Sequence, residues 1–238
     1  MAFNFQTFKT RALTALLFVA VMLTGLLWNF WSFLILFTVI HFGCWYEFVK
    51  LMKKIYAEKY LGYCLFGLIY ITMPIILMFY LHENTIVIFD KDVSDAACFP
   101  TTSSDLFRFS VLLFTIAVIW INDTMAYIVG SFIGKTPFSK ISPKKTWEGT
   151  IGGAVLAIGV AILFANFIRY NIFQISVVTA LIAIFGTLGD LLESKLKRMA
   201  DVKDSGSFMP GHGGFLDRFD SLLVAVPAVW VYVNFFLM

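Results

Sequence analysis

Residues 189–221 contain the side chains of this sequence that are best suited to chemistry. Asp190, Ser194 and Arg198 are spaced four residues apart, so a helix would present them on one face. Asp217 and Asp220 are three residues apart and would also face alike. If apolar helices flank this segment, the chain returns to the same side of a membrane, and Asp190 and Asp217 converge there. Two carboxylates beside basic groups form an oxygen site that suits Mg²⁺ together with substrate phosphates.

Glycine and proline residues lie between Asp190 and Asp217. Pro210, Gly211, Gly213 and Gly214 allow a tight turn in which backbone N–H groups can approach a phosphate. His212 stands between glycines and has few neighbours to pack against, which favours a functional role over a structural one. The alternative is an ordinary charged loop, but such a loop would not need glycine and proline interleaved with paired acids.

Two polar clusters precede this segment. Asp123, next to Asn122, lies inside an apolar run, where ionisable groups are costly and normally face a bundle interior or an aqueous cavity. It is either a carboxylate that supports a ligand or metal, or a residue that packs helices together. Lys144, Lys145 and Thr146 precede another apolar run. Lysine commonly binds phosphate, and the N-terminus of the following helix favours anions. Ordinary anchoring by cytoplasmic lysines is the alternative.

Long apolar runs must position these clusters. The 238 residues are 60% hydrophobic and 14% charged, whereas soluble domains carry about 25% charged residues. Continuous runs of about 20 apolar residues match a membrane-spanning helix and exclude the alternation of a barrel strand. The sequence therefore predicts an all-α, polytopic transmembrane helical bundle that forms one integral membrane domain over residues 1–238. About seven spans are expected, at 12–28, 31–49, 60–81, 107–131, 150–168, 172–192 and 219–237.

The basic residues predict the orientation of this bundle. With a cytoplasmic N-terminus, the cytoplasmic segments hold all of the 18 Lys and Arg residues except Lys91, Arg108 and Arg169. Such a bias predicts that the N-terminus is cytoplasmic and the C-terminus outside. The net charge of +3 is too small to indicate nucleic acid as a partner.

Small residues predict where helices approach one another. Gly130 with Gly134, and Gly149 with Gly153, have the four-residue spacing that allows close helix packing in membranes. The three cysteines have no close pair in the sequence, so we expect them to be unpaired packing residues rather than metal ligands.

The polar segments resemble the phosphatidate cytidylyltransferase family, also called CDP-diacylglycerol synthase. Residues 122–127 and 142–149 and the pair Gly189-Asp190 are similar to family blocks in the same order, and Glu47 more weakly so. Met209 occupies an apolar position where the family prefers Leu, Ile or Phe, which is a conservative departure. The family's C-terminal signature is matched by Ser194, Lys197, Arg198, Lys203, Asp204, Gly206, Pro210, His212, Gly213, Gly214, Asp217, Arg218 and Asp220.

The resemblance implies a metal-dependent nucleotidyltransferase. Its reaction would transfer CMP from CTP to phosphatidate, giving CDP-diacylglycerol and pyrophosphate for phospholipid biosynthesis. Asp190 and Asp217 would bind the metal, which is expected to be Mg²⁺. The family resemblance also allows a second cation. The expected catalytic group is Asp190, Asp217, Lys203, His212 and Asp220. The expected contacts to CTP, to the lipid phosphate or to the metal are Asp123, Lys144, Lys145, Thr146, Ser194, Lys195, Arg198 and Arg218.

The expected partners are therefore CTP, phosphatidate and the lipid bilayer, with no nucleic acid; the oligomeric state is left open, a homodimer included. The expected location is a bacterial inner membrane, crossed several times. Two other classes would use similar residues. A secondary transporter would place its site near the bilayer midplane, and a CTP-dependent lipid kinase would release CDP instead of pyrophosphate.

Overall fold

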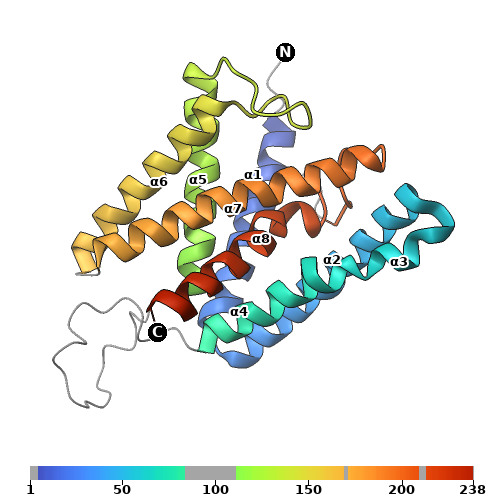
Figure 1. Ribbon diagram of the computed structural model, residues 1–238, viewed down its shortest axis with the longest axis horizontal. Helices are drawn as coiled ribbons and strands as arrows, with labels where there is room; N and C mark the ends of the chain where they lie inside the picture. Colours follow the sequence, from blue (N-terminus) through green and yellow to red (C-terminus); the bar gives the residue numbers. More distant parts are fainter. Residues whose placement is uncertain (1–4, 84–110, 169–170, 209–212, 238) are drawn as a thin grey trace. The chain divides into compact units, whose positions relative to one another are not determined.

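The computed structural model describes residues 5–83, 111–168, 171–208 and 213–237 (Figure 1). Within these ranges the chain is helical, with no strand and one isolated bridge between Pro137 and Thr146, which confirms the all-α class. The α-helices are α1 (Phe5–Leu27), α2 (Phe30–Tyr56), α3 (Tyr60–Cys64), α4 (Met73–Glu83), α5 (Val111–Ile133), α6 (Trp147–Ile168), α7 (Ile172–Met199) and α8 (Leu216–Tyr232). A 3₁₀ turn, η1 (Ala57–Lys59), and two π-helical turns, η2 (Leu68–Thr72) and η4 (Val233–Leu237), complete the described elements.

Several of these helices have the length and composition of membrane spans. Among the described residues, five segments are long and apolar enough to cross a membrane: Phe30–Cys64, Val111–Ile133, Trp147–Asn166, Ile172–Met199 and Leu216–Phe236. This confirms a multi-pass helical membrane protein. Two further predicted spans coincide with shorter apolar helices, Leu13–Leu27 and Leu68–His82. The count of about seven and the side of each terminus stay predictions.

The predicted span at 60–81 is interrupted in the structure. α2 continues beyond its apolar run to Tyr56, and Ala57 then has a φ of 47°, a left-handed value that ends the helix. The chain continues through η1, α3 and η2 before α4 begins. In η2, Thr72 Oγ1 accepts a 2.9 Å hydrogen bond from Trp45 Nε1 and lies 3.0 Å from His41 Nε2. Polar contacts to α2 therefore accompany a π-helical turn that hydropathy alone does not predict.

α7 is longer than the predicted span at 172–192. It continues to Met199, and its last turn contains Lys197 and Arg198, whose positive charges are favourable at a helix C-terminus. Arg198 Nη1 also donates to the carbonyl oxygen of Val202, at 3.4 Å. Asp190, Ser194 and Arg198 all lie within α7, as the prediction of a helix there requires.

The chain divides into two compact units, and each is described by itself. Unit 1 consists of Met1–Ile75 and Glu193–Asp220, and unit 2 consists of Ile76–Leu192 and Ser221–Met238. The boundaries fall within α4, α7 and α8. Asp190 therefore belongs to unit 2 and Asp217 to unit 1.

Glycines allow α5 and α6 to pack closely within unit 2. A Cβ added at Gly149 would lie 2.8 Å from the Ala126 carbonyl oxygen and 2.9 Å from Gly130 Cα. A Cβ added at Gly153 would lie 2.8 Å from the Ala126 backbone nitrogen. Because these neighbours are backbone atoms that cannot rotate away, only glycine fits. The predicted close packing at these glycines is confirmed.

Candidate active site

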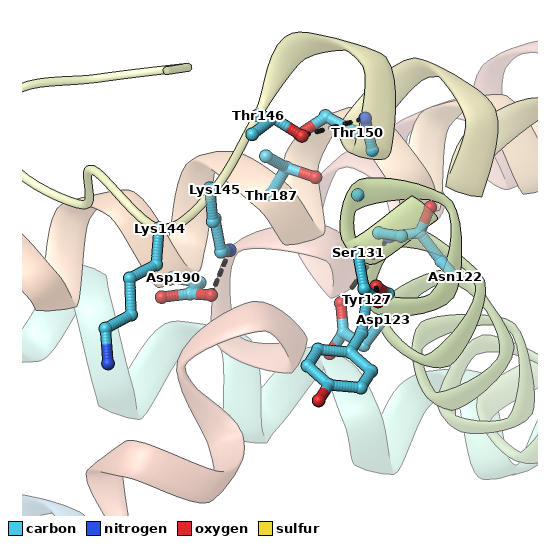
Figure 2. Close-up of a pocket in the computed structure, with 13 residues that line it drawn as sticks. Asn122, Asp123, Tyr127, Ser131, Lys144, Lys145, Thr146, Thr150, Thr187 and Asp190 are labelled. Carbon is cyan, nitrogen blue, oxygen red and sulfur yellow. Dashed lines mark hydrogen bonds and ion pairs between the residues drawn. The ribbon is translucent and has the colours of Figure 1, made fainter. Parts of the chain in front are cut away.

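A cavity of about 440 Å³ in unit 2 brings together three polar clusters that lie far apart in the sequence (Figure 2). α5 contributes its residues around Asp123, the segment before α6 contributes Lys144 and Lys145, and α7 contributes Asp190. The lining residues are Asn122, Asp123, Ala126, Tyr127, Gly130, Ser131, Lys144, Lys145, Thr146, Gly149, Thr150, Thr187 and Asp190. Five of the residues predicted from the sequence to form a site thus share one cavity: Asp123, Lys144, Lys145, Thr146 and Asp190.

An ion pair between Lys145 and Asp190 crosses this cavity. Figure 2 shows that Lys145, rather than Lys144, points to the Asp190 carboxylate. The two side chains are 30% and 29% exposed, so water reaches both groups. A partly hydrated ammonium–carboxylate pair can exchange partners, because neither group depends on the other alone for solvation. The arrangement can therefore accept an incoming anion at Lys145 or a cation at Asp190.

Backbone hydrogen bonds hold the segment that carries these lysines. Phe138 N–H donates to the Lys145 carbonyl oxygen at 2.7 Å, and Trp147 N–H donates to the Thr136 carbonyl oxygen at 3.0 Å. The Phe138 and Trp147 rings pack with their centroids 4.4 Å apart. These contacts close residues 136–147 into a compact loop, so Lys145 leaves the backbone from a fixed position.

The first turn of α6 fixes the same loop from its other side. The Glu148 carboxylate accepts hydrogen bonds from the backbone N–H groups of Lys135 and Thr136, at 3.1–3.2 Å. Thr146 Oγ1 accepts from Gly149 N–H at 3.1 Å and so caps the helix. Accepting this bond does not use the hydroxyl proton of Thr146, which keeps its ability to donate.

Polar groups with oxygen atoms lie around the cavity. Asn122 is 5% exposed, and its Oδ1 is buried without a hydrogen-bond partner among the described residues. The carboxylates of Asp123 and Asp190 line the cavity, and carboxylate oxygens are the ligands that Mg²⁺ prefers. In the part of the chain that the structure describes, no group of three or more His, Cys, Asp or Glu side chains is arranged to hold a metal. A cation here would therefore take further oxygens from substrate phosphates or water.

A second polar cluster, in unit 1, surrounds Asp217 at the start of α8. Asp217 Oδ2 accepts from the backbone N–H groups of Ser205 and Gly214, at 2.9 and 2.8 Å, and lies 2.9 Å from Ser205 Oγ. Asp217 Oδ1 accepts from Lys197 Nζ at 2.6 Å. Lys197 also pairs with Glu193, which is fully buried. The Asp217 carboxylate is therefore fixed in place by donors on both of its oxygens.

The remaining predicted residues lie in unit 1 or outside the described residues. Asp220 is buried, Ser194 is half-buried on α7, and the four basic side chains of Lys195, Arg198, Lys203 and Arg218 are exposed. His212 lies outside the described residues, as do Pro210 and Gly211. The convergence of Asp190 and Asp217 on one cation stays a prediction, because these residues belong to different units.

Sequence reasoning assigned no role to two buried acids, Glu47 and Glu193, or to half-buried Lys197. Glu47 is 4% exposed and accepts hydrogen bonds from Ser205, Phe215 and Leu216. The signal that could have identified it is the same one that identified Asp123: an ionisable residue inside an apolar run.

Comparison with known proteins identifies the family. The model of the cytidylyltransferase family matches residues 96–236, which is more than half of the chain. The chain belongs to the cytidylyltransferase family. The matched residues include the whole lining of the cavity and also Asp217, whereas Glu47 precedes them.

Several bacterial relatives are phosphatidate cytidylyltransferases. The protein of Staphylococcus haemolyticus is 46% identical over 132 residues, which cover 54% of this chain and 50% of the relative. The Bacillus subtilis protein is 42% identical over 135 residues, covering 56% and 50%. The Synechocystis protein is 44% identical over 125 residues, covering 52% and 43%. The chain thus spans about half the length of the curated relatives it matches.

Proposed function

We propose that this protein transfers the cytidylyl group of CTP to phosphatidate, forming CDP-diacylglycerol and pyrophosphate. The observation that carries the proposal is the cavity in which Lys145 pairs with Asp190 beside Lys144 and Asp123. Exchangeable cations and carboxylates in one cavity suit a reaction between two polyanions. The family match and the names of the relatives agree with this chemistry.

The reaction needs positioning more than it needs a base. A phosphate monoester has its second pKa near 6, so the phosphatidate oxygen is mostly ionised near pH 7. That oxygen attacks the α-phosphorus of CTP, a new P–O bond forms, and the bond between the α-phosphorus and its bridging oxygen to the β-phosphate breaks. Pyrophosphate leaves with the electron pair of that bond. The main obstacle is the repulsion between two polyanions, which cationic groups reduce.

The lysines of the cavity can reduce this repulsion. Lys145 leaves Asp190 and pairs with a phosphate of the incoming nucleotide, and Lys144 lies beside it at the rim. Lys195, Arg198, Lys203 and Arg218 supply further phosphate contacts, and Ser194, Thr146 and His212 donate hydrogen bonds. These assignments follow from charge and from the family resemblance.

Mg²⁺, when bound, would neutralise phosphate charge and orient the attack in line. The residues proposed to hold it are Asp190 and Asp217, with Asp123 and Asp220 in support, and a second cation is part of the proposal. Freed from Lys145, the Asp190 carboxylate is able to take a cation. Asp217 retains lone pairs on Oδ1 beyond the one that accepts from Lys197.

The proposed location is the cytoplasmic face of a bacterial inner membrane. Phosphatidate is an amphiphile that remains in the bilayer, whereas CTP is dissolved in the cytoplasm. A site at the ends of apolar helices can receive both. The basic residues that the sequence places on the cytoplasmic side support this orientation.

The test is the identity of the products. The purified protein, in mixed micelles with phosphatidate and CTP, is expected to form pyrophosphate and CDP-diacylglycerol when Mg²⁺ is present and neither product after chelation. ³¹P NMR resolves both products in one sample. Release of CDP with no pyrophosphate would instead indicate a CTP-dependent lipid kinase and would overturn the proposal.

A further inference from the structure

Glu47 of α2 forms a buried attachment point for two segments that precede Asp217 in the chain. Its Oε1 accepts from Phe215 N–H at 3.0 Å, and its Oε2 accepts from Leu216 N–H and Ser205 Oγ, both at 2.8 Å. Leu216 is the first residue of α8, so the carboxylate lies at the positive end of that helix. We call residues 205–208 and 213–216 the loop ends; Glu47 binds both of them.

Two glycines leave room for this carboxylate. A Cβ added at Gly206 would lie 2.0 Å from Glu47 Oε1, and one added at Gly214 would lie 2.2 Å from the same atom. At both glycines the three nearest atoms all belong to Glu47. Neither glycine has a positive φ. It is the space filled by Glu47, rather than an unusual backbone conformation, that excludes a side chain at these positions.

α2 contacts the same loop at a second point, one helical turn earlier. A Cβ added at Gly43 would lie 2.5 Å from the ring of Phe215, so this ring packs directly on the helix backbone. The Phe208 ring packs on Phe215 with a centroid distance of 4.1 Å. Gly43 and Glu47 are four residues apart and share a helix face. One face of α2 thus provides both a flat surface for an aromatic ring and an acceptor for backbone N–H groups.

Ser205 connects Glu47 to Asp217. Its Oγ lies within hydrogen-bond distance of both carboxylates, but a hydroxyl has one proton and donates to one acceptor at a time. Asp217 Oδ2 already accepts two backbone N–H groups, from Ser205 and Gly214. Ser205 can therefore donate its hydroxyl proton to Glu47 while Asp217 keeps its hydrogen bonds from the two backbone N–H groups. Glu47 thus binds Ser205, which also donates to Asp217, and it binds Phe215 and Leu216, which directly follow the second backbone donor to Asp217, Gly214.

From these contacts we infer that Glu47 is a positioning residue, which acts on the reaction by fixing the loop ends and through them Asp217. The effect on catalysis rests on the proposed function, because it requires Asp217 to take part in cytidylyl transfer. The attachment of the loop ends to α2 does not rest on it. Glu47 lies outside the matched residues 96–236, so the inference assigns a role to the N-terminal part of the chain.

Glutamine cannot replace Glu47 in this arrangement. Both carboxylate oxygens accept from backbone N–H groups, and an amide would direct its NH₂ group at one of those donors. We expect Glu47→Gln to lower kcat by about 10- to 100-fold, the cost of losing hydrogen bonds to a charged acceptor, with KM for CTP changed less than about 3-fold. Glu47→Asp keeps the charge but is one methylene shorter, so it should recover part of kcat. Glu58→Gln, an exposed acid shortly after α2, is the matched control and should behave like wild type.

Hydrogen–deuterium exchange of the full-length protein gives a readout that does not depend on activity. Peptides that contain Phe215 and Leu216 should exchange faster in Glu47→Gln than in wild type and Glu58→Gln. Wild-type exchange in Glu47→Gln would overturn the attachment. Faster exchange with wild-type kcat would overturn the catalytic role. If wild type itself forms no CDP-lipid, the proposed function fails, and the exchange data still decide the attachment.

A double-mutant cycle tests the contact itself. Gly206→Ala alone should strongly impair activity and thermal stability, because its Cβ overlaps the Glu47 carboxylate. In a Glu47→Ala background, Gly206→Ala should lower kcat by less than a further factor of about 3, because the carboxylate that its Cβ would overlap is gone. Additive losses would show that Gly206 does not meet Glu47 and would overturn the inference.

Discussion

Replacing Lys145 with methionine tests the ion pair at the centre of the cavity. Methionine keeps the length and the apolar stem of lysine but removes the ammonium group, so the substitution isolates the charge. In the free protein it leaves Asp190 without its lysine partner. In the complex with CTP it removes one cation from the phosphates. The expected result is a large loss in kcat/KM for CTP with little change in folding.

The size of this loss follows from the exposure of the pair. A unit charge about 4 Å from a phosphate charge contributes about 4 kcal/mol at an effective dielectric constant of about 20. Lys145 and Asp190 are 30% and 29% exposed, and Lys145 gives up its pair with Asp190 on binding. Both effects reduce the net contribution, to about 2 kcal/mol, which corresponds to a loss of about 30-fold in kcat/KM.

The assay is the initial rate of pyrophosphate release at varied CTP and fixed phosphatidate. Lys140→Met is the matched control, because Lys140 lies in the same loop and is exposed outside the cavity lining. It should stay within about 2-fold of wild type, as expected for surface substitutions. Lys145→Arg should lose less than Lys145→Met, because it keeps the charge. Equal rates for Lys145→Met and wild type would refute a role for this lysine in binding CTP.

Three further predictions follow from the same geometry. Asp217→Asn should lower kcat by at least about 100-fold in protein that remains folded by circular dichroism, since it weakens a proposed metal ligand and the bond to Lys197; full activity would remove Asp217 from the mechanism. Gly153→Ala should lower Tm, at a cost of about 1–3 kcal/mol, because its Cβ would meet the Ala126 backbone. Gly159→Ala on the same helix has no atom within 4 Å of its Cβ and should leave Tm unchanged or raise it; equal shifts for both would contradict the packing. Chelation of divalent cations should abolish product formation and Mg²⁺ should restore it, whereas persistent turnover in EDTA would exclude metal dependence.

The helical fold and much of the cavity could be predicted from the sequence. Apolar runs locate the spans because a helix in lipid must satisfy its own backbone hydrogen bonds. Asp123 and Asp190, which lie inside apolar runs, and the lysines before the run at 150–168 were predicted as site residues, because charged groups persist in a membrane only where they meet partners or water; that they share one cavity comes from the structure. The glycines of α6 indicated where α5 packs against it.

The contacts of Glu47 and the π-helical turn η2 before α4 could not be predicted in the same way. Glu47 reaches Phe215 across 168 positions of sequence, and no local spacing encodes such a contact. The π-helical turn η2 interrupts the apolar run at 60–81, whose hydropathy gives no sign of a break. Thr72, the last residue of this turn, forms polar contacts with His41 and Trp45 of α2, which lie 31 and 27 positions earlier in the chain. Hydropathy reports how strongly a segment favours lipid over water, and it carries no information about backbone geometry.

The most direct test of the account follows the phosphorus atoms of CTP. Purified protein is supplied with phosphatidate and with CTP labelled with ³²P at either the α- or the γ-phosphate, and the lipid is extracted after a single turnover. Cytidylyl transfer predicts that the α label enters the lipid and that the γ label is released as pyrophosphate in equal amount. Recovery of the γ label in the lipid, with the α label left in CDP, would contradict the account.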